Sequence, residues 1–247
     1  MTSRPGDGRP LVGLIVPPAT GLVPPEPPAL YGDALRFAAR GLALATMTRD
    51  GYDDVIDRVE AAARALAAEG AAAVALMGTS LSFYRGAAFN DALVERMASA
   101  TGLPVTTMSC AVVEALRAVG ARRLAVATAY VDEVNDRLTA FLLHHGFEVL
   151  GLDSLQISAV GDVLAIGDDD LIGLGTRAFV AAPEADALLV SCGGLQTLSV
   201  TLPLEDRLGV PVISSAVAGA WAAARLIGHG GEAPGYGRLL ETAPKSE

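Results

Sequence analysis

The sequence predicts an α/β protein built from two similar lobes, each containing a parallel β-sheet that is covered by helices. Short apolar runs alternate with Ala-rich segments of helical spacing along the chain, a pattern typical of parallel sheets with helices on both faces. The halves also repeat: Gly-Leu-Pro-Val at 102–105 recurs as Gly-Val-Pro-Val at 209–212, each followed by a Ser/Thr turn and an Ala-rich helix. We therefore expect two pseudo-symmetric, flavodoxin-like (Rossmann-like) lobes that face each other.

The first half of the chain supplies three predicted strands, at 11–16, 72–77 and 105–108. The first is the earliest apolar run after a Pro/Gly-rich start, the second follows a Gly/Ala segment, and the third begins at the valine of the repeated Gly-Leu-Pro-Val. The helical patterns between and after these strands predict helices at 53–69, 88–101 and 112–119.

The second half repeats this order, with predicted strands at 124–128, 188–191 and 210–214. The helix expected to begin at Val131 is supported by Val134, Leu138 and Phe141, which share one helical face, and Gly146 suits its end. The full set of helices predicted here is 131–145, 168–182 and 216–227. We expect lobe 1 to comprise residues 1–118 plus 216–247, and lobe 2 to comprise residues 119–215.

The composition argues against nucleic-acid and membrane partners. The 247 residues carry a net charge of -10, and no basic stripe that would bind phosphates is present in the sequence. No segment approaches the ~20 consecutive apolar residues of a membrane span. Two cysteines far apart in the sequence do not form a disulfide framework. We expect a cytoplasmic monomer that acts on a small molecule.

The sequence also argues against two kinds of cofactor. The only lysine, Lys245, lies in the polar C-terminal tail, whereas Schiff-base chemistry such as that of pyridoxal phosphate needs a buried, positioned lysine. None of His144, His145 and His229 has the spacing of a metal site, and we expect surface or capping roles for them. We therefore expect neither a Schiff-base cofactor nor a histidine-bound metal.

Small and polar residues follow the predicted strands. In parallel sheets ligands bind beyond the carboxyl ends of the strands, so these turns should line one cleft between the lobes. Any one of them alone suits an ordinary strand–helix connection, since Gly, Ser and Thr are common there. Four related turns favour a ligand site. They are Pro17-Pro18, Gly78-Thr79-Ser80, Tyr130 and Cys192-Gly193.

Cys192 is the candidate acid/base group of this cleft. It ends an apolar strand and is followed by Gly193 and Gly194, which permit close approach of a ligand to backbone N–H groups. The earlier segment Val-Ala-Leu-Met-Gly-Thr-Ser at 74–80 is the equivalent strand end in the first half of the chain, and it has Gly78 at the position of the thiol. The cleft is therefore expected to carry a thiol on one face only. Cys110 lies in a turn that enters a helix, and we expect it to pack rather than react.

Four segments together resemble the arylmalonate decarboxylase family, within the aspartate/glutamate racemase superfamily. They are Met-Gly-Thr-Ser-Leu-Ser-Phe-Tyr-Arg-Gly at 77–86, the 16–18 turn with Gly-Leu-Val-Pro at 21–24, Ala-Thr-Ala-Tyr at 127–130, and Ser-Cys-Gly-Gly-Leu at 191–195. The resemblance runs from about Leu11 to Leu239.

The resemblance implies cofactor-free decarboxylation of 2-aryl-2-alkylmalonates to (R)-2-arylalkanoates, through an enediolate that Cys192 protonates. It further implies that the retained carboxylate is bound by Thr79, Ser80, Tyr130, Cys192 and Gly193. The implied apolar pocket around the leaving carboxylate comprises Pro17, Pro18, Leu44, Met47, Leu81, Val160, Val163 and Gly194. Racemases and isomerases of the superfamily carry a second cysteine at the place of Gly78.

Two other classes of function stay open from the sequence. An amino-acid racemase or a maleate isomerase of the same superfamily would share the fold, but both resemble enzymes with two thiols, and Gly78 argues against them. A non-catalytic module that binds small carboxylates would also share it, because a fold alone does not imply a reaction.

Overall fold

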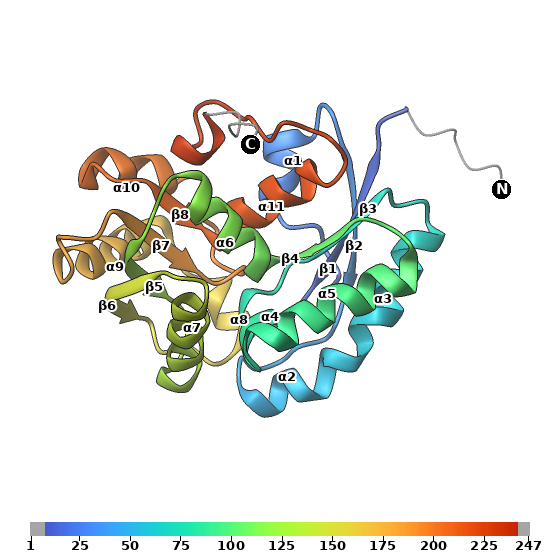
Figure 1. Cartoon of the computed structure of the whole chain (residues 1–247), viewed down its shortest axis with the longest axis horizontal. Helices are drawn as coiled ribbons and strands as arrows, with labels where there is room; N and C mark the ends of the chain where they lie inside the picture. Colours follow the sequence, from blue (N-terminus) through green and yellow to red (C-terminus); the bar gives the residue numbers. More distant parts are fainter. Residues whose placement is uncertain (1–7, 242–247) are drawn as a thin grey trace.

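The computed structural model describes residues 8–241 and contains two four-stranded parallel sheets, one in each half of the chain (Figure 1). The first sheet has the order β2-β1-β3-β4 and consists of β1 (Leu11–Val16), β2 (Arg36–Gly41), β3 (Ala73–Leu76) and β4 (Val105–Thr107). The second has the order β6-β5-β7-β8 and consists of β5 (Arg123–Thr128), β6 (Glu148–Ser154), β7 (Ala187–Ser191) and β8 (Val212–Ser214). The prediction of two similar parallel α/β lobes is confirmed.

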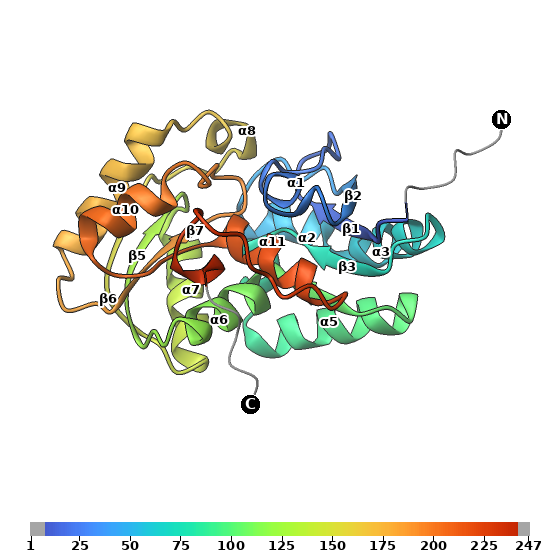
Figure 2. The same cartoon turned by 90° about the horizontal axis from the view of Figure 1, so that it is seen from above.

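Helices cover both sheets (Figures 1 and 2). Those of the first half are α1 (Glu26–Tyr31), α2 (Arg49–Val55), the 3-10 turn η1 (Ile56–Arg58), α3 (Val59–Ala68), α4 (Thr79–Phe83), α5 (Ala87–Thr101) and α6 (Met108–Ala118). Those of the second half are α7 (Asp132–His144), α8 (Val160–Val163), α9 (Asp168–Val180), α10 (Thr201–Leu208), α11 (Ser215–Arg225) and the 3-10 turn η2 (Arg238–Leu240). Within the described residues, no helix is both long enough and apolar enough to cross a bilayer.

The internal repeat has a structural cause. Gly102 and Gly209 end α5 and α10 in the left-handed conformation, with φ of 68° and 75°, which glycine adopts without steric cost. The following strand then leads to a hydroxyl that caps the next helix. Thr107 accepts a hydrogen bond from the backbone N–H of Cys110, and Ser214 accepts one from Val217. The two halves therefore use the same strand and helix boundaries.

Several predicted elements were wrong or missing. The single helix expected at 53–69 is α2, η1 and α3, because Thr48 caps a helix that begins earlier, at Arg49. The strands β2 and β6 were missed because each is an edge strand that is only partly buried, so its sequence lacks a continuous apolar run. The other missed elements, α1, α4, α8 and α10, are helices of four to eight residues, too short to show a clear helical period.

The helix α11 packs at the centre of the molecule, against α6 and α1 and against strands of both sheets (Figure 2). All of its residues from Ser215 to Ala224 are buried, including Trp221. Its Ala- and Gly-rich surface allows neighbouring backbones to approach closely, which explains how a chain with few aromatic residues fills its core. The close packing fixes the two sheets relative to each other.

Candidate functional site

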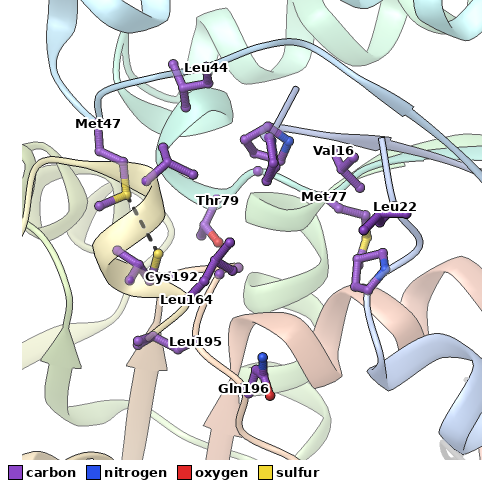
Figure 3. Close-up of a pocket in the computed structure, with 18 of the residues that line it drawn as sticks. Val16, Leu22, Leu44, Met47, Met77, Thr79, Leu164, Cys192, Leu195 and Gln196 are labelled. Carbon is purple, nitrogen blue, oxygen red and sulfur yellow. Dashed lines mark hydrogen bonds between the residues drawn. The ribbon is translucent and has the colours of Figure 1, made fainter. Parts of the chain in front are cut away.

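A cavity of about 260 Å³ lies at the carboxyl ends of the strands, with walls from both lobes (Figure 3). Twelve residues that the sequence placed in the cleft line it: Pro17, Pro18, Leu44, Met47, Gly78, Thr79, Ser80, Val160, Val163, Cys192, Gly193 and Gly194. The remaining walls are formed by Val16, Thr20, Leu22, Val23, Pro24, Pro25, Glu26, Met77, Leu164, Leu195 and Gln196. The cleft expected between the lobes is therefore present.

Strand register places Gly78 and Cys192 at equivalent positions. In the first sheet Leu76 pairs with Thr107, the residue that caps α6. In the second sheet Val190 pairs with Ser214, the residue that caps α11. Two residues beyond these equivalent strand positions lie Gly78 and Cys192, which both line the cavity. The cavity therefore has a thiol at one of two equivalent strand ends and a hydrogen atom in place of a side chain at the other.

Two loops, one from each lobe, hydrogen-bond to each other and position the apolar wall of the cavity. Thr46 and Ala159 form an antiparallel bridge. The backbone N–H of Met47 donates to the carbonyl of Ser158 at 2.7 Å, and that of Val160 donates to Ala45 at 3.1 Å. These hydrogen bonds bring the side chains of Met47 and Val160 to the same cavity from opposite lobes.

The thiol of Cys192 is buried, with 6% of the residue exposed, and donates to the sulfur of Met47 at 3.8 Å (Figure 3). Burial raises the pKa of Cys192 to about 11, although the backbone N–H groups of Gly194 and Leu195 and the Tyr130 hydroxyl act in the opposite direction. The thiol is therefore protonated at neutral pH. In this state it is an acid that can deliver a proton, rather than a thiolate nucleophile.

Hydrogen-bond donors face the thiol from the first lobe. Thr79 and Ser80 begin α4. The first helical hydrogen bond is made by the backbone N–H of Ser82, which donates to the carbonyl of Gly78 at 3.2 Å. The N–H groups of the first helical turn thus lack carbonyl partners within the helix, as at every helix start. The Thr79 hydroxyl donates to the Met108 sulfur at 2.9 Å, a weak acceptor that a carboxylate oxygen would outcompete.

Gly193 is required for the backbone to pass close to this region. A Cβ atom at this position would lie 2.7 Å from the Met108 sulfur and 3.1 Å from the carbonyl oxygen of Met77. Any other residue would have to move the flexible Met108 side chain and pack tightly against the Met77 carbonyl. Glycine here therefore keeps the second lobe's backbone close to the donors of the first lobe.

Two residues predicted for the site do not line the cavity. Leu81 is fully buried behind Gly78, where its Cβ lies 3.3 Å from the place that a Gly78 Cβ would occupy. Tyr130 is also fully buried, and its hydroxyl has no partner within hydrogen-bond distance in the described part of the chain. Burial, and then the neighbouring Cys192 and Tyr52, raise the pKa of Tyr130. The Tyr130 hydroxyl is thus a neutral donor next to the thiol.

Glu26 is a cavity residue that the sequence analysis missed. Only 2% of it is exposed, burial raises the pKa of its carboxyl group, and the backbone N–H groups of Glu26 and Thr197 partly offset this shift. Burial is the main cause of the shift at both Glu26 and Cys192, and neither group is among the causes of the other's shift. Its signal in the sequence is an acid placed between prolines at the start of a helix.

The other candidate reactive residues lie away from the cavity. Cys110 accepts a hydrogen bond from the side-chain amide of Asn90 at 3.0 Å and does not line the cavity. His144 and His145 lie at the end of α7, and the ring of His229 packs on Tyr31. Residues 8–241 contain no group of three or more His, Cys, Asp or Glu that could hold a metal ion. Lys245 lies outside the described residues.

Comparisons with known proteins identify the family. The family model described as arylmalonate decarboxylase matches residues 12–240. An arylmalonate decarboxylase from Bordetella bronchiseptica is 55% identical over 233 residues, covering 94% of this chain and 97% of that protein. A maleate isomerase from Nocardia farcinica is 27% identical over 240 residues, covering 93% of this chain and 94% of that protein.

Solved structures agree with the sequence relatives. Unliganded arylmalonate decarboxylase superposes with a TM-score of 0.86 at 55% identity, covering 94% of this chain and all of the other. A liganded double variant of that enzyme, with one glycine changed to cysteine and one cysteine to serine, superposes with a TM-score of 0.92 at 54% identity, covering 94% and 99% of the two chains. The chain belongs to the arylmalonate decarboxylase family.

Proposed function

We propose that the protein is a carboxy-lyase that converts 2-aryl-2-alkylmalonates to (R)-2-arylalkanoates without a cofactor, with Cys192 as the proton donor. Family membership supports the reaction class. The observation that carries the mechanism is the pairing of a buried, protonated thiol with a glycine at the equivalent strand end of the same cavity. The R hand of the product rests on the family resemblance.

The first step breaks the bond between the α-carbon and one carboxylate. That carboxylate leaves as CO₂, and the bonding electron pair passes to the α-carbon and into the retained carboxylate, giving an enediolate. Neutral donors suit this change because they gain strength as negative charge builds on the retained oxygens. We assign this task to Thr79, Ser80 and the backbone N–H groups of Cys192 and Gly193, which line the cavity. We add the Tyr130 hydroxyl, which is buried beside Cys192 and Thr79 and has no partner among the described residues.

The apolar wall favours departure of CO₂. Leu44, Met47, Val160 and Val163 line the cavity, and Leu44, Met47 and Val163 are buried. A carboxylate held among such side chains loses its hydration, whereas neutral CO₂ does not need any. We assign the leaving carboxylate to this wall, beside the Met47 sulfur that contacts the Cys192 thiol.

The second step forms one C–H bond. The Cys192 S–H proton passes to the α-carbon, the enediolate becomes an ordinary carboxylate, and the resulting thiolate takes a proton from solvent. Because Gly78 offers no acid on the opposite side, the proton arrives on one face. Racemisation or isomerisation would need acid and base groups on both faces, so Gly78 disfavours these alternatives. A module that only binds carboxylates would not need a protonated thiol beside the donors.

The reaction is tested by incubating the protein with methyl(phenyl)malonate. Headspace CO₂ measures decarboxylation, and chiral chromatography measures the hand of the 2-phenylpropionate formed. The proposal predicts CO₂ release in equal amount to a single enantiomer. Racemic product from the enzymatic reaction, or conversion of maleate to fumarate without CO₂ release, would refute it.

The raised pKa of Cys192 predicts slow alkylation at neutral pH. In a Cys110→Ala background, iodoacetamide should inactivate the protein far more slowly at pH 8 than it alkylates a small free thiol. The rate should still be rising at pH 10, because the thiolate fraction grows until the pH passes about 11. A rate that reaches its plateau near pH 8 would show that Cys192 is a thiolate at neutral pH.

A Glu26→Gln substitution tests whether the buried carboxyl group acts as a second acid. Because the proposed mechanism uses Cys192 as its one acid, the variant should keep kcat within about threefold of the parent and still give one enantiomer. General acid–base residues typically contribute about 10²–10⁴-fold. A loss of that size, with a normal thermal unfolding curve, would assign Glu26 to the chemistry and refute the single-acid mechanism.

We also propose that the protein acts as a cytoplasmic monomer on small dicarboxylates, with lobes formed by residues 1–118 plus 216–247 and by residues 119–215. The strands of the two sheets fall on either side of residue 119. The packing of α11 on α1 and α6 supports its place in lobe 1. Light scattering should give a mass near 25.2 kDa, and twice that mass would exclude a monomer.

A further inference from the structure

A pair of buried serine hydroxyl groups contacts the start of α4 without lining the thiol cavity. Ser82 belongs to α4 itself, and Ser109 lies in α6, which packs on α4. Their hydroxyl oxygens are 2.6 Å apart, and only 0% and 1% of the two residues are exposed. Gly78, Thr79 and Ser80, which form the start of α4, do line the cavity. The serine pair therefore lies behind the residues that face the cavity.

The two hydroxyl groups converge on two backbone carbonyl groups. The Ser82 hydroxyl has the carbonyl oxygens of Gly78 and Thr79 as acceptors, each at 2.9 Å. The Ser109 hydroxyl donates to the Thr79 carbonyl at 3.0 Å. A serine that bonds back to its own helix is common, but Ser109 comes from a different helix, 27 residues further along the chain. Two helices thus hold the same two peptide groups in place.

Holding these carbonyl groups also orients the N–H groups of the residues that follow. The Gly78 carbonyl shares a peptide group with the N–H of Thr79, and the Thr79 carbonyl shares one with the N–H of Ser80. Peptide groups are planar and residues 8–241 contain no cis peptide bond, so the C=O and N–H of each group point in opposite directions. Both N–H groups belong to the first helical turn, whose donors lack carbonyl partners within the helix. Each N–H is therefore directed away from the serine pair.

We propose that Ser82 and Ser109 are positioning residues for decarboxylation, which aim and polarise the N–H groups of Thr79 and Ser80 toward the enediolate. A hydrogen bond accepted by a carbonyl draws electron density from the N–H of the same peptide group, which becomes a stronger donor. Donors that are already oriented where charge develops need no reorganisation during the reaction. The inference rests on the proposed function, because these donors affect the rate only if charge builds on the retained carboxylate.

The test replaces the two serines by alanine and measures both the donors and the rate. The backbone amide nitrogen chemical shifts of Thr79 and Ser80, recorded by NMR on isotope-labelled protein, should move upfield in the Ser82→Ala/Ser109→Ala variant. In the same variant kcat for methyl(phenyl)malonate should fall about 10–10²-fold, less than the loss of about 10²–10³-fold that removal of a whole oxyanion donor causes. Binding of an arylacetate, measured by calorimetry, should change little, because its carboxylate gains no charge.

Two further variants complete the test. Ser109→Ala keeps the hydrogen bonds of Ser82 within α4, so it leaves the helix start intact and should give smaller changes in the same direction. The matched control is Thr176→Val, which removes a hydroxyl that donates to the carbonyl of Ile172, one turn earlier in α9, at 2.7 Å. Thr176 does not line the cavity, so this variant should keep the kcat and both amide shifts of the parent.

Unchanged amide shifts in the two serine variants would overturn the inference, and so would changed shifts with an unchanged kcat. A loss of arylacetate binding as large as the loss of kcat would also overturn it, because the serines would then only maintain the shape of the cavity. The chemical shifts need no turnover. Absence of CO₂ release by the parent would therefore refute the proposed function, whereas unchanged shifts would refute the role of the serines alone.

Discussion

Replacing Cys192 with alanine is expected to lower kcat for methyl(phenyl)malonate by about 10²–10⁴-fold, the range that general acid catalysis contributes. The substitution removes the acid that converts the enediolate to product, while the donors of Thr79, Ser80 and Gly193 stay in place. Binding of an arylacetate, measured by calorimetry, should therefore change little. The small amount of product still formed should be racemic, because water would protonate either face.

The matched control is Cys110→Ala, which removes the other thiol of the chain. Cys110 contacts Asn90 and does not line the cavity, so this variant should keep both the rate and the single hand of the product. Unchanged CO₂ release by the Cys192→Ala variant would remove Cys192 from the mechanism. A loss of arylacetate binding equal to the loss of rate would instead assign Cys192 a binding role.

Changing Gly78 to cysteine is expected to give a variant that racemises 2-arylpropionates, a reaction that the parent should not perform. The backbone at Gly78 is extended, with φ of -137° and ψ of 98°, so it accepts a side chain. A Cβ atom there would lie 3.1 Å from a ring carbon of Pro17 and 3.3 Å from the Cβ of Leu81. Those contacts are tight, and we expect a stability loss of about 1–3 kcal/mol and slower decarboxylation.

The Gly78→Ser variant separates crowding from acid/base chemistry, since it introduces nearly the same volume without a thiol. It should show slower decarboxylation and no loss of optical purity when incubated with one enantiomer of 2-phenylpropionate. The Gly78→Cys variant should convert that enantiomer progressively to the racemate, as followed by chiral chromatography. A folded Gly78→Cys variant that leaves optical purity intact would contradict the placement of Gly78 opposite Cys192.

The sequence predicted the central strands of both sheets because β1, β3, β5 and β7 are buried on both faces. Such strands are continuous apolar runs, and their boundaries are marked by glycines and prolines. The edge strands β2 and β6 escaped prediction because they are only partly buried and each has a charged residue near both ends, Arg36 and Arg40 in β2 and Glu148 and Asp153 in β6. The other two edge strands, β4 and β8, were predicted because each follows the repeated Gly-x-Pro-Val segment and is almost entirely buried.

The site was predicted well where it is built from strand ends. Gly78, Cys192 and their neighbours follow central strands, so sheet geometry brings them together once the repeat is recognised. Glu26 and Tyr52 were missed because they come from α1 and α2, short helices that were not predicted at those positions. Leu81 was placed in the lining by resemblance alone, and in the structure it lies in α4, fully buried behind Gly78. Tyr130 was placed there also as a strand-end residue, but its side chain is fully buried and does not line the cavity.

The most direct test moves the acid from one face to the other. A Gly78→Cys/Cys192→Ser variant keeps one thiol in the cavity but places it at the equivalent end of β3 instead of β7. The mechanism predicts that decarboxylation of methyl(phenyl)malonate by this variant gives predominantly the opposite enantiomer of 2-phenylpropionate. Product of the same hand as the parent's, measured by chiral chromatography, would show that the position of the thiol does not decide which face is protonated.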